Sequence, residues 1–213
     1  KLLQDPEIIS MGGGNPAKEA FPVNSVREII SELLSKDGVG LLQYGSTEGY
    51  LPLREAYLEH VVRQKGIDGD LPNVMTLTGS MQGLDLICKV LLDRGDTVLV
   101  ESPTFLGALQ AFTIYGANLV PVSMDSEGVI IEEMIKKHHP KLFYCIPTFQ
   151  NPTGKTLLTK RREQLARLCE KYDVILIEDD PYCELRYRGE PVPPIKKFDA
   201  ASRVIMLSSF SKT

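Results

Sequence analysis

Short continuous runs of apolar residues alternate along this chain with longer stretches in which apolar residues follow helical spacing. Six of the short runs are rich in β-branched residues and predict strands at 74–78, 97–101, 118–123, 142–146, 174–178 and 204–207. Because these runs are apolar throughout instead of alternating with polar residues, we expect both faces of the strands to be covered. This is typical of a parallel sheet between two layers of helices.

The stretches between these runs predict helices. Ser25 and Glu28 have the spacing of a capping box before an apolar helical pattern, which we expect to end by Gly38. Residues 81–92 are apolar on nearly every side and predict a central, buried helix. A further helix is predicted after Thr159, which would be its N-cap. Repeated alternation of strand and helix predicts a doubly wound, mostly parallel α/β domain with helices on both faces, which binds its ligand at the carboxyl ends of the strands.

Composition and charge narrow the class of protein. The chain has 213 residues, of which 43% are hydrophobic, and this is enough to bury a full core. A formal net charge of −4 argues against a nucleic-acid-binding surface. We find neither a signal-peptide pattern nor an apolar run of roughly 20 residues, so we expect a cytoplasmic protein with no membrane partner. The four cysteines form no C-x-x-C pair, and we expect no metal site.

Four polar motifs follow predicted strands. They are TGSMQG at 78–83, NPTG at 151–154, EDDPY at 178–182 and SSFSKT at 208–213. The carboxyl ends of parallel strands lie at one edge of a sheet, so the four motifs are expected to meet there. Lys212 follows a buried strand, which is an unusual position for an ordinary surface charge, although a solvated lysine in a loop remains the alternative.

Two of these motifs have chemistry that can be worked out locally. At Ser80 a hydroxyl, backbone N–H groups and the positive end of a helix converge on a possible anion site, whereas the alternative is a plain glycine turn with a serine cap. Strand geometry sends Asp179 and Asp180 to opposite faces, so only one of them can point into a site. The alternative for this pair is a solvated acidic strand end.

Together, in this order, the motifs resemble the class I/II aminotransferases, which are pyridoxal-phosphate enzymes of fold type I. The resemblance covers essentially the whole chain, and the segments 9–22 (ISMGGGNPAKEAFP) and 43–56 (QYGSTEGYLPLREA) point to the aminoadipate, kynurenine, aromatic and branched-chain subgroup. It implies an incomplete cofactor-binding large domain at 41–213 and an amino-terminal segment at 1–40 that contributes to the small domain and the substrate site. The carboxyl-terminal domain of the family is absent.

The resemblance also assigns roles to residues. It implies that Lys212 forms a Schiff base with pyridoxal 5'-phosphate and acts as the general base, and that Asp179 and Tyr182 grip the ring nitrogen and the phenolic oxygen of the cofactor. A carboxylate beside the ring nitrogen favours the protonated ring, which is the better electron sink. The implied cofactor-binding residues are Tyr44, Gly79, Ser80, Met81, Phe105, Asn151, Asp179, Tyr182, Ser209, Ser211 and Lys212. The implied substrate-binding residues are Gly14, Tyr44 and Asn151.

These assignments predict an aminotransferase that moves an amino group between an amino acid and a 2-oxo acid. The resemblance further implies a homodimer with shared active sites, in which Tyr44 reaches the phosphate bound by the partner. Since the family's carboxyl-terminal arginines are missing, we expect the chain by itself to be inactive. Two alternatives stay open: a non-catalytic cofactor-binding sensor of a transcription regulator, and a lyase or decarboxylase on the same scaffold.

Overall fold

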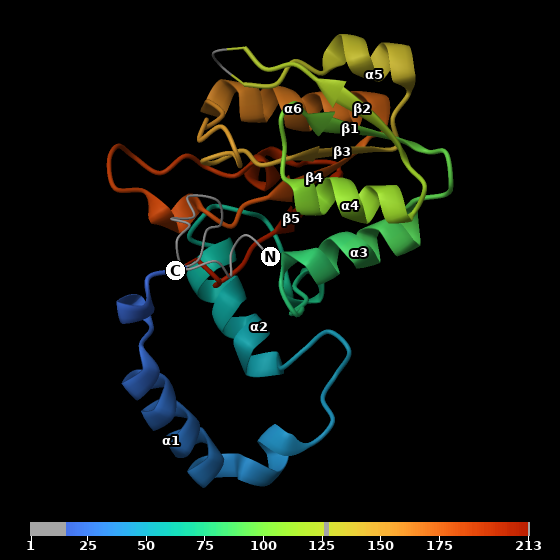
Figure 1. Ribbon diagram of the computed structural model, residues 1–213. Helices are drawn as coiled ribbons and strands as arrows, with labels where there is room; N and C mark the ends of the chain where they lie inside the picture. Colours follow the sequence, from blue (N-terminus) through green and yellow to red (C-terminus); the bar gives the residue numbers. More distant parts are fainter. Residues whose placement is uncertain (1–15, 126–127, 213) are drawn as a thin grey trace, which may run out of the picture. The chain divides into compact units, whose positions relative to one another are not determined.

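The computed structural model describes residues 16–125 and 128–212, and the chain divides into two compact units (Figure 1). The first unit is Lys1–Gly45 and the second is Ser46–Thr213. The sheet, its helices and the four strand-end motifs all belong to the second unit. We therefore describe that unit first and by itself.

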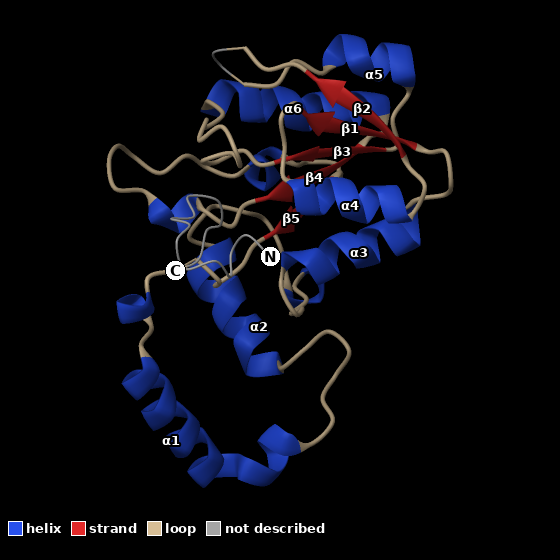
Figure 2. Cartoon of the chain, viewed as in Figure 1, coloured by secondary structure: helices blue, strands red, loops and turns tan. Residues whose placement is uncertain are grey.

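The second unit is built on one parallel sheet of five strands in the order β2-β1-β3-β4-β5 (Figure 2). The strands are β1 (Thr97–Glu101), β2 (Asn118–Val122), β3 (Leu142–Cys145), β4 (Ile175–Asp179) and β5 (Val204–Leu207). The order reverses between β1 and β3, as in other doubly wound sheets. Five of the six predicted strands are thus present, and the predicted fold class is confirmed.

Helices cover both faces of the sheet (Figure 1). Helices α3 (Ser80–Leu91) and α4 (Leu106–Ile114) pack on one face, and α5 (Glu132–His138) and α6 (Thr159–Tyr172) pack on the other. Neighbouring strand residues point to opposite faces, so Phe143 of β3 lies in the core beneath α5 and α6, whereas Tyr144 lies in the core beneath α3 and α4. The continuous apolar runs of the sequence follow from these two cores.

Helix α3 corrects one prediction. The apolar pattern at 81–92 predicted a central, buried helix, but only one side is buried: Leu84 and Cys88 are 0% exposed while Val90 is 77% exposed. The helix packs on one face of the sheet, and its opposite side is left in contact with solvent. Periodicity alone overestimated how far the helix is enclosed.

The prediction of a strand at 74–78 is wrong. This segment is not paired in the sheet, and its amides bond elsewhere: Thr76 N donates to Glu48 O at 2.9 Å and Thr78 N donates to the Gln82 side chain. A strand needs a neighbouring strand to pair with as well as suitable side chains. Within the described residues, no strand pairs with this segment. The short helical elements of the unit are α2 (Leu51–Tyr57), η3 (Leu58–Val62), η4 (Leu71–Asn73), η5 (Cys183–Leu185) and η6 (Ile195–Phe198).

The amino-terminal unit contains η2 (Lys18–Ala20) and α1 (Val23–Leu42). Ser25 lies inside α1 and Pro22 precedes the helix, so the predicted capping box is wrong. Asp37 has non-helical dihedral angles (φ −153°, ψ 60°) and kinks the helix directly before Gly38, where we had predicted its end. Within the part of the chain that the structure describes, no helix has both the length and the apolar character needed to cross a membrane.

Candidate functional site

The predicted site residues of the second unit follow strands or begin helices at the carboxyl edge of the sheet. Gly79 and Ser80 begin α3, Phe105 precedes α4, and Asp179 ends β4. The remaining ones lie in the loops after β3, β4 and β5: Asn151, Tyr182, Ser209, Ser211 and Lys212. The parallel sheet therefore brings residues separated by more than one hundred positions to the same edge.

A hollow of about 900 Å³ lies beside β5 at this edge. Its lining includes four residues predicted to bind the cofactor, namely Gly79, Ser80, Ser209 and Ser211. The hydroxyl oxygens of Ser209 and Ser211 are 2.7 Å apart, and Ser211 N donates to Ser209 Oγ at 3.1 Å. The structure thus brings the first and last of the four motifs together in one hollow.

Ser80 is a buried donor at the start of α3. Its Oγ has no hydrogen-bond partner in the described part of the chain. Gly79 before it has φ +80°, a conformation that favours glycine, and nothing lies within 4 Å of the place where its Cβ would be. A buried hydroxyl without a partner, at the positive end of a helix of 12 residues and next to open space, suits an anion.

Asp179 is a buried carboxylate with one oxygen bonded and one not. Its Oδ2 accepts a hydrogen bond of 2.7 Å from the Tyr144 hydroxyl, whereas Oδ1 is buried and has no partner among the described residues. Burial raises the pKa of Asp179 to about 6, the Tyr144 hydroxyl opposes this rise, and the nearby Asp180 carboxylate adds to it. Asp179 Oδ1 is therefore available to accept a hydrogen bond from a donor group of a ligand.

Asp180 has different neighbours from Asp179. Its Oδ2 lies 4.0 Å from Lys65 Nζ, and Lys65 also contacts Cys183 Sγ at 2.8 Å and Glu184 at 3.1 Å. Asp179 is bonded from β3, whereas Asp180 faces the segment that follows η3. The two carboxylates point to different parts of the molecule, as strand geometry predicted.

Sequence reasoning missed another buried carboxylate, Glu101 at the end of β1. Its Oε2 accepts from Ile146 N at 3.0 Å and from Gln150 Nε2 at 3.2 Å, and Gln150 Nε2 also donates to Pro103 O at 2.7 Å. Burial raises the pKa of Glu101 to about 7. Gln150 therefore ties the loop before Phe105 to the turn that carries Asn151. A glutamate closing an apolar strand was a signal available in the sequence.

The other predicted residues are placed less tightly. Phe105 and Tyr182 are partly buried against the core beneath α3 and α4, and Met81 lies beside Phe105 near Gly107. Asn151 and Lys212 are partly buried. Thr104, which we did not predict, has a buried hydroxyl without a partner in the described residues, directly before Phe105.

Two predicted residues lie outside this description. Tyr44 belongs to the amino-terminal unit, and its side chain is 98% exposed. Gly14 falls outside the described residues. The roles predicted for both therefore rest on the resemblance alone.

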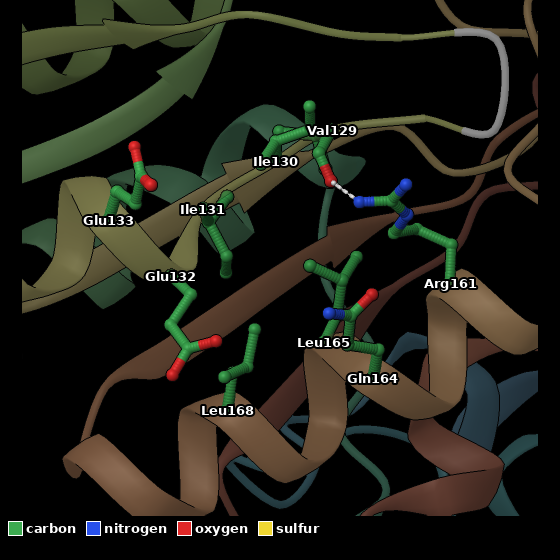
Figure 3. Close-up of a pocket in the computed structure, with 9 residues that line it drawn as sticks. All are labelled: Val129, Ile130, Ile131, Glu132, Glu133, Arg161, Gln164, Leu165 and Leu168. Atoms are coloured by element: carbon green, nitrogen blue, oxygen red, sulfur yellow. Dashed lines mark hydrogen bonds between the residues drawn. The ribbon is translucent and has the colours of Figure 1, made fainter.

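A second hollow of about 190 Å³ lies between α5 and α6 (Figure 3). Arg161 on its wall donates to Val129 O at 3.1 Å and pairs with Asp125 at 2.8 Å. Glu132 accepts from Tyr172, Lys136 and Lys171, which lower its pKa to about 2. These charges are already paired within the chain. Across 16–125 and 128–212, no group of three or more His, Cys, Asp or Glu side chains could hold a metal ion.

The fold and the strand-end residues define a doubly wound α/β domain in which Ser80, whose hydroxyl has no partner among the described residues, begins α3 and the buried Asp179 carboxylate ends β4. Comparison with known proteins gives the family: residues 6–213 match the sequence model described as "Aminotransferase class I and II", and the chain belongs to this family. The predicted family membership is thus confirmed.

Individual relatives fit the predicted subgroup. The chain is 46% identical to "Aromatic-amino-acid aminotransferase 1" of Thermococcus litoralis, over 100% of this chain and 53% of that protein. It superposes with a TM-score of 0.91 on the crystal structure of Pyrococcus horikoshii kynurenine aminotransferase in complex with PMP, with 42% identity over 99% of this chain and 54% of that one. A more distant relative is the "Uncharacterized HTH-type transcriptional regulator YisV" of Bacillus subtilis, 32% identical over 97% of this chain and 43% of that protein. The chain spans about half the length of the curated relatives it matches.

Proposed function

We propose that this chain supplies the cofactor-binding half of a pyridoxal-phosphate-dependent aminotransferase, which moves an amino group between an amino acid and a 2-oxo acid. The names of the relatives support the reaction class. The observation that carries the proposal is the buried Asp179 Oδ1, which lacks a partner within the described chain and lies at the carboxyl edge of the sheet.

The residues at this edge fit the cofactor. Asp179 Oδ1 would accept a hydrogen bond from the protonated ring nitrogen, and the carboxylate charge would keep that nitrogen protonated. The bond would also give Oδ1 the partner that it lacks within the described chain, since an unpaired buried carboxylate oxygen is costly. When bound, the cofactor supplies an electron sink for the electrons left on the substrate Cα. Phe105 would stack on the ring, and Asn151 and Tyr182 would bind its phenolic oxygen.

The phosphate would lie at the start of α3. Gly79, Ser80 and Met81 would face it from that helix, and Ser209 and Ser211 would face it from the loop after β5. The shared hollow and the unpartnered Ser80 hydroxyl support this assignment. Backbone N–H groups at a helix start stabilise such an anion without a full positive charge.

Lys212 would hold the cofactor covalently and then act as the base. Its amine would bond to the aldehyde carbon of the cofactor, with water as the leaving group. Once the substrate amine had released it, the Lys212 amine would take the proton from the substrate Cα. Gly14, Tyr44 and Asn151 would contact the substrate.

Covalent labelling tests this proposal. We would reduce the protein expressed from the complete open reading frame with borohydride in the presence of pyridoxal phosphate and map the label by peptide mass spectrometry. We expect the pyridoxyl group on Lys212 and no specific label in Lys212→Ala, whereas Lys65→Ala should still be labelled at Lys212. A label on another lysine, or none with cofactor in excess, would reject the proposal.

The same proposal includes a homodimer in which Tyr44 completes the partner's phosphate site. Such sharing needs two-fold symmetry, because each loop serves the other protomer. Lys212→Ala and Tyr44→Ala proteins would be mixed under conditions that allow subunit exchange. One site of the mixed dimer then carries both changes and the other carries neither, so activity should rise above that of either parent. No rise after demonstrated exchange would reject the shared site.

A second candidate is the cofactor-binding sensor of a transcription regulator, which the match to YisV favours. A sensor would bind pyridoxal phosphate at Lys212 but would not turn over an amino acid with a 2-oxo acid. Transamination by the complete gene product separates the two candidates. Product analysis in the same assay would also reveal a lyase or decarboxylase, since a decarboxylase releases carbon dioxide and a lyase consumes the amino acid without aminating the added 2-oxo acid.

A further inference from the structure

We propose that Tyr144 is a positioning residue that holds Asp179 ionised and orients its free oxygen. The role of that oxygen toward the cofactor ring rests on the proposed function. Tyr144 is 0% exposed and Asp179 is 4% exposed, and the Tyr144 hydroxyl lies 2.7 Å from Asp179 Oδ2. No motif of the sequence pointed to Tyr144.

The direction of this hydrogen bond is fixed by chemistry. Burial first, and then the neighbouring Asp179 charge, raise the pKa of Tyr144 above its usual value, so the phenol keeps its proton and donates it. An ionised carboxylate can only accept. The bond therefore stabilises the charged form of Asp179 and not its protonated form.

The position of the hydroxyl is set by the sheet. Tyr144 is paired with Val100 of β1 on one side and with Ile177 of β4 on the other. Its ring packs edge-on against Phe112 of α4, with centroids 5.7 Å apart and an interplanar angle of 70°. Because the core holds the Tyr144 side chain on three sides, its hydroxyl fixes the position of Asp179 Oδ2. Asp179 Oδ1 is then the oxygen left for a ligand.

The charges around this pair oppose the ionisation of Asp179. Asp180 at the same strand end raises the pKa of Asp179, and Glu101 of β1 and the Cys145 thiol of β3 are the other titratable groups near Tyr144. None of these groups donates a proton to Asp179 Oδ2. Without the Tyr144 hydroxyl, Oδ2 would lack a partner within the described chain, as Oδ1 does.

The test removes one hydroxyl and leaves the ring. In Tyr144→Phe, the acid dissociation constant of Asp179 should fall about tenfold to a hundredfold, because a hydrogen bond to a charged group is lost. Infrared spectroscopy of the cofactor-free complete gene product would follow the carboxyl band of protonated Asp179 with pH, and Asp179→Asn identifies the band. Tyr172→Phe is the matched control, because the Tyr172 hydroxyl also donates to a carboxylate, Glu132, at 2.9 Å.

A second variant preserves the packing if Tyr144→Phe fails to fold. Incorporating 3-fluorotyrosine at position 144 keeps the ring and makes the hydroxyl a stronger donor, so the pKa of Asp179 should fall. In the holoenzyme, Tyr144→Phe should lower kcat about tenfold or more while the KM for the amino acid changes little. The control Tyr172→Phe should change neither constant.

An unchanged Asp179 titration in the folded variants would overturn the proposal, and so would an equal shift in Tyr172→Phe. The infrared measurement needs no cofactor. A shift in the pKa of Asp179 in Tyr144→Phe, together with no pyridoxyl label on Lys212, would therefore reject the proposed function. The proposed role of Tyr144 in positioning Asp179 would still stand.

Discussion

Two regions of the second unit differ in how their polar groups are bonded: the carboxyl edge of the sheet and the hollow between α5 and α6. At the carboxyl edge of the sheet, Ser80, Thr104 and Asp179 each keep a buried polar atom without a partner in the described chain. In the hollow between α5 and α6, Arg161 donates to Val129 O (Figure 3) and pairs with Asp125. Glu132 accepts from the Tyr172 hydroxyl.

This difference is the one expected between the proposed binding site and a packing gap. An unpartnered buried polar atom costs free energy, so a protein keeps one where a ligand later supplies the missing bond. Paired groups offer a ligand much less. The contrast also appears in the carboxylates: burial raises the pKa of Glu101 and Asp179 at the edge, whereas proton donors lower that of Glu132 between the helices.

The largest expected effect is on turnover, and it tests the comparison between the two regions at Asp179. Asp179→Ala in the complete gene product should lower turnover on the order of a thousandfold, because the charge that keeps the ring nitrogen protonated is lost. Asp180→Ala should reduce turnover far less, and Arg161→Ala in the other hollow should leave it unchanged. Steady-state kinetics with matched circular dichroism would check this, and equal losses at Asp179 and Asp180 would contradict the choice of face.

The second effect is the pH dependence of stability. Glu101 has a pKa of about 7 in the folded protein against 4.5 as its ordinary value. Between these values the folded state keeps a proton that the unfolded state has lost, so Glu101 should contribute a fall of about 3 kcal/mol in the free energy of unfolding as pH rises through this window. Glu101→Gln should remove that fall, as urea denaturation at a series of pH values would show.

Glu132 is the control with the opposite sign. Its pKa of about 2 lies below the ordinary 4.5, so its contribution to stability is present above pH 4.5 and is lost as pH falls toward 2. Glu132→Gln should weaken the protein at neutral pH and flatten only the acid side of the profile. The same flattening in both variants would contradict the contrast between the two regions.

The third effect compares two threonines. Thr148 Oγ1 accepts from the fully buried Arg162 guanidinium at 3.0 Å, whereas the Thr104 hydroxyl has no partner in the described residues. Thr148→Val should lower the free energy of unfolding by about 1–3 kcal/mol, because a buried charge loses an acceptor. Thr104→Val should leave the stability of the cofactor-free protein unchanged or slightly raised. Urea denaturation midpoints measure both, and a larger loss at Thr104 would show that its hydroxyl is bonded.

The smallest effect is at Ser80. Ser80→Ala should weaken pyridoxal-phosphate binding about tenfold, since one hydrogen bond to the phosphate is lost. The stability of the cofactor-free protein should not fall, because the hydroxyl has no partner there. Equilibrium dialysis would measure the affinity, with Gln164→Ala in the other hollow as control. Unchanged affinity in Ser80→Ala would remove Ser80 from the site.

Much of the fold could be predicted because its signals are local. The strands β1 to β5 were predicted to within two residues at each end, since continuous β-branched runs mark strands covered on both faces. The segment 74–78 has the same composition and forms no strand, because pairing depends on a neighbour that its own residues do not specify. Ser25 has a capping spacing, but the chain is already helical at Val23.

The candidate site divides in the same way. Alternation along β4 was enough to separate Asp179 from Asp180. Tyr144 could not be found, because an apolar run that contains a tyrosine gives no sign of the carboxylate that meets it across the sheet. Gln150 stands next to Asn151, yet its bond to Glu101 joins two loops that only the fold brings together.

The two borders of the sheet have unequal consequences for how the chain behaves at high concentration. Pro121 lies in β2, where it withholds a backbone N–H from any strand arriving at that border. β5 pairs only with β4 within the described residues, has no proline, and lies along the large hollow. Residues 46–213 kept alone should therefore self-associate through β5 as intermolecular cross-strand pairs, so that a charge introduced at Ile205 protects against aggregation more than one introduced at Leu119.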